Sequence, residues 1–98
     1  MKKIDNFING SLQTFTKKYL PVEDPSKGEI IAEVALSSKK DFDLTIESSK
    51  KAFLDWSQVT PLKRSRILSS YKVIIEKNID LIARIISEEH GKTLDDAK

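Results

Sequence analysis

The chain has 98 residues, enough for one modest domain, and a chain of this length buries only a little over ~60% of the surface that its unfolded form exposes. Its 17 basic and 15 acidic residues leave a net charge of +2 with the two signs interspersed, which argues against nucleic acid as the main partner. No apolar run approaches the roughly 18 residues of a membrane-spanning helix, so no membrane partner is expected either.

The N-terminus and the cysteine count exclude further classes of protein and of functional site. Lys2 and Lys3 are followed by Asp5, Asn6 and Asn9, where a secretory signal would need an apolar stretch, so we expect a cytoplasmic protein. The chain contains no cysteine. This excludes disulfides, thiolate metal ligands and a cysteine nucleophile within these residues.

Residues 1–36 are predicted to form strands and turns. In the stretch 7–12, Asn9 and Gly10 lie between apolar residues and tolerate the positive φ angles of a tight hairpin. A second strand is expected over 14–22, and Pro21 indicates an edge strand because proline cannot donate to a sheet.

A second turn and a third strand complete this part of the prediction. Asp24 at a turn start, Pro25 with its fixed φ and Gly28 at the reversal are typical of a tight turn. The stretch 29–36 then alternates its side chains between two faces. We therefore expect a small antiparallel sheet in the first third of the chain.

Residues 38–98 are predicted to be helical. Ser38 and Asp41 form a capping-box pattern for a first helix that ends near Trp56, with an apolar stripe that includes Phe42 and Phe53. Thr60 followed by Pro61 indicates the start of a second helix.

A third helix is expected over 79–90, with Asn78 as its N-cap and Gly91 as its end. Its isoleucines and leucine fall on more than one side, so we expect it to be buried on more than one face. Thr93 with Asp96 predicts the first turn of a fourth helix, and because a first turn is costly to nucleate, we expect the chain to continue in a larger protein.

The triplet Gly91-Lys92-Thr93 is the ending of a phosphate-binding loop. That motif needs another glycine five residues earlier, where this sequence has Ile86, and a strand leading into the loop, where this sequence predicts a helix. We therefore interpret Gly91 as a helix end and Thr93 as a new cap. A nucleotide-binding protein is kept only as a third hypothesis.

The remaining candidates also have structural interpretations. His90, the one histidine, lies at a helix C-terminus, which the helix dipole favours without any catalytic role. The basic cluster Lys63, Arg64 and Arg66 falls in the first turns of the second helix and is interpreted as a solvated face or as ion pairs to another part of a larger protein. Trp56 and Tyr71 are expected in a core or an interface rather than as stacking platforms.

The order of motifs resembles the N-terminal part of the NAD-dependent aldehyde dehydrogenase superfamily over nearly all 98 residues. The resemblance rests on the 7–11 hairpin, the turn at 24–29, the helix that ends in Phe53 and Trp56, and the closing Glu89-His90-Gly91-Lys92. Asp24 and Lys27 replace the family's usual asparagine and threonine, which keeps the turn chemistry. The closing element is most similar to the CoA-acylating methylmalonate-semialdehyde dehydrogenases.

The resemblance implies an α/β parent enzyme in which residues 1–98 form the N-terminal part of the coenzyme-binding domain, an α+β segment. It implies NAD and CoA as cofactors of the parent, a semialdehyde as substrate and a homo-oligomeric assembly. The family's thiolate attacks the aldehyde and hydride passes to NAD. No position here matches a catalytic, cofactor-binding or metal-binding residue of the family, so we expect the 98 residues alone to be inactive and without a cofactor. The alternative hypothesis is a small free-standing interaction module without enzymatic activity.

Overall fold

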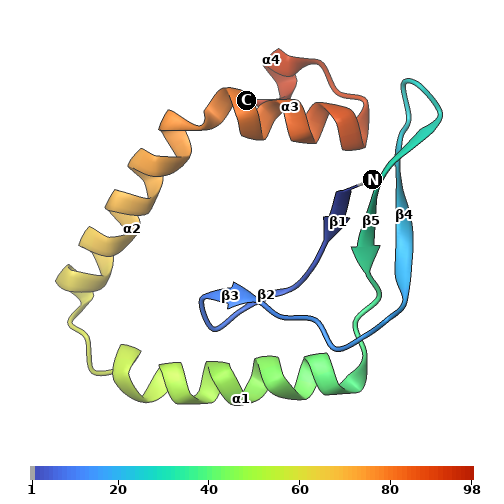
Figure 1. Cartoon of the computed structure of the whole chain (residues 1–98). Helices are drawn as coiled ribbons and strands as arrows, with labels where there is room; N and C mark the ends of the chain where they lie inside the picture. The colour runs from blue at the N-terminus through green and yellow to red at the C-terminus, as the bar shows by residue number, and fades with distance from the viewer. Residues whose placement is uncertain (1) are drawn as a thin grey trace. The chain divides into compact units, whose positions relative to one another are not determined.

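The computed structural model describes residues 2–98 (Figure 1). Within these residues, five short strands precede four helices. In chain order the elements are β1 (Lys2–Ile4), β2 (Phe7–Ile8), β3 (Ser11–Leu12), β4 (Tyr19–Asp24), β5 (Glu29–Ala35), α1 (Lys39–Trp56), α2 (Pro61–Lys77), α3 (Ile79–His90) and α4 (Leu94–Ala97). The chain divides into two compact units: one holds the residues up to Glu23 with Ile30–Gln58, and the other holds Asp24–Glu29 with Val59–Lys98.

The larger sheet has three strands in the order β1-β5-β4. β4 lies at an edge, as Pro21 predicted. One expectation needs correction, because β1 pairs with β5 in parallel, with Lys2 opposite Ala32 and Ile4 opposite Val34. The sheet is therefore mixed rather than wholly antiparallel.

The smaller sheet is the predicted hairpin. β2 and β3 are antiparallel, with Phe7 opposite Leu12 and Ile8 opposite Ser11. Asn9 and Gly10, the two residues between them, have φ angles of 52° and 80°. Positive φ at both central residues is the geometry of a two-residue type I′ turn, so this prediction is confirmed.

The strand expected over 14–22 begins only at Tyr19. The backbone N–H groups of Phe15 and Thr16 donate to the carboxylate of Asp41, at 2.6 Å and 3.2 Å, instead of to a neighbouring strand. The side chain of a residue 26 positions away therefore replaces the ladder hydrogen bonds that a strand would need.

Within residues 2–98 the helices begin where the sequence predicts, but one expected side-chain cap is absent. Ser38 and Asp41 form the capping box of α1, and the Thr60 hydroxyl accepts from the Lys63 N–H at the start of α2. Asn78 makes no side-chain cap for α3. Its Nδ2 donates instead to the Ile74 carbonyl at 2.9 Å, so Asn78 satisfies the end of α2 rather than the start of α3.

Little apolar surface is buried within the described residues. Ile8, Ala32 and Ala83 are the buried apolar residues. α3 is only partly covered within residues 2–98: Ala83 is buried, whereas Ile79 and Ile82 are each 37% exposed. The burial on more than one face that the sequence predicts would need cover from outside these residues. Among residues 2–98, the structure has no helix that combines the length and apolarity needed to cross a membrane.

Candidate functional site

The Gly91-Lys92-Thr93 triplet joins two helices. Gly91 ends α3 in the left-handed conformation, with φ 71°, and its N–H donates to the Ser87 carbonyl. Thr93 begins α4, and its hydroxyl accepts from the Asp96 N–H. The helix-end and helix-cap interpretation is confirmed, and the segment lacks the strand that leads into a phosphate-binding loop.

The other predicted candidates lie on three different helices. His90 is the last residue of α3, Trp56 is the last residue of α1, and Tyr71 lies on α2 with 60% of its surface exposed. Within residues 2–98, no group of three or more His, Cys, Asp or Glu side chains is placed to hold a metal ion.

The three basic residues at the start of α2 differ in their surroundings. Lys63 and Arg66 are exposed, whereas Arg64 is half-buried. The Nε atom of Arg64 is buried without a hydrogen-bond partner in the described part of the chain. Its position at helical spacing from Leu68 and Tyr71 was the signal in the sequence that could have separated Arg64 from its neighbours.

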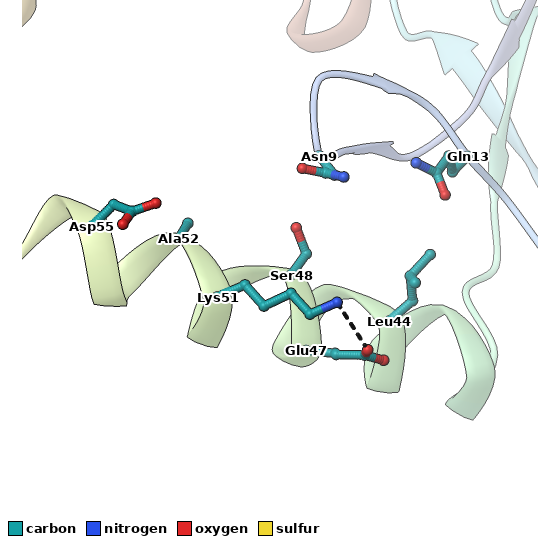
Figure 2. Close-up of a pocket in the computed structure, with 8 residues that line it drawn as sticks. All are labelled: Asn9, Gln13, Leu44, Glu47, Ser48, Lys51, Ala52 and Asp55. Carbon is teal, nitrogen blue, oxygen red and sulfur yellow. Dashed lines mark ion pairs between the residues drawn. The ribbon is translucent and has the colours of Figure 1, made fainter.

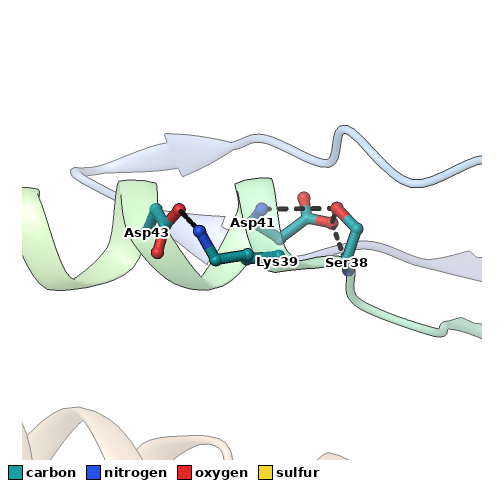
Figure 3. A network of polar contacts seen from close by, with 4 residues as sticks. All are labelled: Ser38, Lys39, Asp41 and Asp43. Atoms are coloured by element: carbon teal, nitrogen blue, oxygen red, sulfur yellow. Dashed lines mark hydrogen bonds and ion pairs between the residues drawn. The ribbon is translucent and has the colours of Figure 1, made fainter.

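The most buried polar side chain is Asp41, which is 1% exposed. Its carboxylate accepts hydrogen bonds from the backbone N–H of Ser38 at 2.8 Å and from the Ser38 hydroxyl at 2.7 Å, in addition to those from Phe15 and Thr16. Figure 3 shows the Ser38 contacts beside the exposed Lys39–Asp43 ion pair of 3.3 Å. The local cap is predictable from the sequence, whereas nothing near Asp41 in the sequence indicates its hydrogen bonds to residues 15 and 16.

These hydrogen bonds stabilise the charged form of Asp41. The backbone N–H of Phe15, followed by that of Ser38, lowers the pKa of the Asp41 carboxyl to about 2, against the opposing effect of burial. The four groups that contact its carboxylate are all donors that hold it in place. Asp41 is thus a structural acceptor, because a carboxylate with so low a pKa is a poor general base.

A shallow pocket of about 320 Å³ lies between the β2–β3 hairpin and α1 (Figure 2). Asn9 and Gln13 line one side, and the α1 side is formed by Leu44, Glu47, Ser48, Lys51, Ala52 and Asp55. Lys51 pairs with Glu47 at 3.5 Å, so the basic group of the pocket is neutralised by its own helix. The pocket has polar groups but no activated nucleophile, and it offers no evident chemistry.

The comparisons with known proteins all indicate the same family. The aldehyde dehydrogenase family matches residues 12–98. A relative from Dictyostelium discoideum, provisionally named an acylating mitochondrial methylmalonate-semialdehyde/malonate-semialdehyde dehydrogenase, is 43% identical over 93 residues, which are 94% of this chain and 18% of that protein.

Two solved structures have nearly the same fold over this segment. The methylmalonate-semialdehyde dehydrogenase of Oceanimonas doudoroffii matches with a TM-score of 0.95 and 38% identity, over 99% of this chain and 20% of that one. A provisionally named methylmalonate-semialdehyde dehydrogenase from Sinorhizobium meliloti 1021, solved with NAD, matches with a TM-score of 0.95 and 32% identity over the same shares.

These matches confirm the α+β segment and the resemblance in the sequence, and they support the dehydrogenase interpretation over a free-standing interaction module. The chain spans about a fifth of the length of the relatives that it matches. Since the family match covers residues 12–98, the chain belongs to the aldehyde dehydrogenase family.

Proposed function

We propose that residues 1–98 are the N-terminal part of the coenzyme-binding domain of an NAD-dependent aldehyde dehydrogenase. The parent enzyme oxidises malonate semialdehyde or methylmalonate semialdehyde and releases the acyl group to CoA. The observation that carries this proposal is the 43% identity to a relative named for that acylating activity, over 94% of this chain. The NAD bound in the Sinorhizobium meliloti structure supports the choice of coenzyme.

The role of this segment in the proposed enzyme is structural. The chain has no cysteine, so the thiolate that attacks the aldehyde would come from outside these 98 residues. NAD would accept the hydride, and CoA would accept the acyl group. The segment would contribute packing surface, because its helices expose apolar side chains that a parallel sheet and further helices could cover.

The experiment begins with the native protein. An antibody raised against residues 1–98 would capture the gene product, and mass spectrometry would give its size and its peptides. The captured protein would then be assayed for NADH formation with malonate semialdehyde and methylmalonate semialdehyde, each with and without CoA. The proposal requires a product several-fold larger than this chain, with a cysteine-bearing peptide and CoA-dependent turnover.

Two results would reject parts of the proposal. A native product that ends at Lys98 and forms no NADH would reject the enzymatic function. Turnover that does not depend on CoA would reject the acylating reaction while leaving aldehyde oxidation in place. The purified 98-residue chain serves as the control and is expected to form no NADH.

Oligomeric state and location are parts of the same proposal. We propose a homo-oligomeric parent enzyme in the cytoplasm, without nucleic acid or membrane partners. Sedimentation of the captured native product tests its assembly. Subcellular fractionation with the same antibody tests its compartment, and enrichment in an organelle would overturn the cytoplasmic assignment.

A further inference from the structure

Arg64 lies on a face of α2 whose other members are apolar. Leu68, Tyr71 and Ile75 follow it at four, seven and eleven residues, the spacing of one side of a helix. Leu68 and Tyr71 are about 60% exposed, although large apolar side chains are stabilised by burial. This face, defined by Arg64, Leu68, Tyr71 and Ile75, is called the α2 docking face below.

The buried Nε–H group of Arg64 lacks a hydrogen-bond acceptor within residues 2–98. The guanidinium of this side chain takes part in no ion pair there. The first turn of α2 contains no acidic residue. A buried unsatisfied donor is unfavourable, so an acceptor that reached Arg64 would remove a penalty as well as add an attraction.

The surroundings of Arg64 set the chemistry of its partner. A guanidinium is a planar fork that binds a carboxylate through two parallel hydrogen bonds. The apolar neighbours Leu68 and Tyr71 match a partner whose acid is flanked by apolar side chains. A nucleic-acid backbone fits less well, since phosphate binding would favour basic neighbours on this face over Leu68, Tyr71 and Ile75.

We propose that the α2 docking face is covered by the remainder of the dehydrogenase chain, and that this remainder brings an aspartate or glutamate carboxylate to the Arg64 guanidinium. This inference rests on the proposed function. The relatives that match this segment are about five times its length, so most of their chain is available as the covering part. Arg64 is then the polar anchor that fixes how the apolar face docks, and it has no catalytic role.

The test uses a chimera in which this chain replaces the matching first fifth of the Oceanimonas doudoroffii enzyme, to which it is 38% identical. Three variants are compared by thermal unfolding: Arg64→Met, Arg64→Lys and Arg66→Met. Methionine keeps an apolar stem of similar length but removes the charge. Arg66 is the matched control, because it is a basic residue of the same helix that is exposed and lies outside the docking face.

We expect Arg64→Met to lower the Tm of the chimera by on the order of 5 °C or to abolish its soluble yield, because the partner carboxylate is left buried and unpaired. The Tm of the Arg64→Lys chimera should lie between those of the Arg64→Met and unsubstituted chimeras, since lysine keeps the charge but cannot form the two parallel hydrogen bonds of a guanidinium. Arg66→Met should stay within about 1 °C. In the 98-residue chain alone, Arg64→Met should leave the unfolding midpoint unchanged or raise it, because no partner is lost there.

Each contrary outcome has a distinct meaning. Equal Tm values for Arg64→Met and Arg66→Met in a folded chimera would overturn the role of Arg64 while leaving the proposed function intact. An equal loss of stability in the 98-residue chain and in the chimera would place the role of Arg64 inside this segment and would also overturn the inference. An unsubstituted chimera that aggregates would overturn the covering of the α2 docking face by that remainder, while the NADH assay of the captured native product still decides the proposed function.

Discussion

At the scale of single residues, the Asp41 carboxylate connects two separate parts of the backbone. Its carboxylate serves as a helix cap for α1 and as the acceptor for the backbone of residues 15 and 16. A buried carboxylate is costly unless its lone pairs are used, and here four donors use them. Asp41 therefore holds the segment before β4 against the start of α1.

The pKa of Asp41 predicts an acid-sensitive contact. The folded-state pKa of about 2 lies below the ordinary value of 3.8, so the charged form stabilises the folded state. This stabilisation is complete above about pH 4 and is lost as the pH falls through the folded-state pKa. Asp41→Asn should lower the urea midpoint of the dilute chain at neutral pH, because an amide donates where this site needs an acceptor.

The control for this experiment is Asp43→Asn. Asp43 lies on the same helix, but its ion pair with Lys39 is exposed and should contribute little. Urea unfolding followed by circular dichroism, at neutral pH and at about pH 3, measures both variants. We expect the difference in urea midpoint between the unsubstituted chain and Asp41→Asn to be smaller at the lower pH. An unchanged gap, or a control that behaves like Asp41→Asn, would contradict this account.

At the scale of elements, the turn between β4 and β5 meets the end of α3. The Asp24 carboxylate accepts from the N–H and the hydroxyl of Ser26, which shape the turn and lower the pKa of Asp24. A Cβ built on Gly91 would approach the Pro25 Cγ atom to 3.2 Å. Gly91 is thus required by its positive φ and by a close neighbour.

Gly91→Ala should destabilise the chain for two separable reasons. The left-handed conformation costs roughly 1–2 kcal/mol for a residue with a Cβ, and the contact with Pro25 adds to this. Gly10→Ala is the matched control, because Gly10 also has a positive φ but no atom within 4 Å of an added Cβ. Urea midpoints should fall further for Gly91→Ala, and the excess should shrink in a Pro25→Ala background. If the two alanine variants were equal, the contact with Pro25 would be unimportant.

Local signals made most elements predictable, whereas contacts between distant residues were not predictable. Asn9-Gly10, Thr60-Pro61 and Gly91 each act within a few residues, and each marks a turn or a helix boundary that the structure confirms. The parallel pairing of β1 with β5 joins segments about thirty residues apart. A strand of three residues is too short for its side-chain pattern to predict this pairing. The unpartnered Nε of Arg64 likewise depends on burial, which the sequence does not encode locally.

At the scale of the whole molecule, the apolar surface is arranged for a larger assembly. The pocket-lining face of α1, with Leu44, Ser48 and Ala52, lies beside the hairpin. The more apolar stripe remains exposed: Phe42 is 62% exposed and Phe53 is 65% exposed. Because exposed patches of this kind are uncommon on monomers, the segment is better understood as part of a larger folded protein than as an independent domain.

This arrangement predicts the behaviour of the isolated chain. We expect the 98-residue chain to bind a hydrophobic dye and to self-associate, since Phe53 and Leu54 form part of an apolar surface on α1 that nothing in the described chain covers. The double variant Phe53→Ser and Leu54→Ser should reduce both dye fluorescence and the sedimenting mass. Lys51→Ser, on the side of α1 that lines the pocket beside the hairpin, is the control and should change neither. The chimera with the Oceanimonas doudoroffii enzyme should bind less dye per molecule than the isolated chain, because its remaining four fifths would cover this surface. A monodisperse, cooperatively unfolding monomer that binds no dye would instead show that these 98 residues fold as a self-sufficient unit.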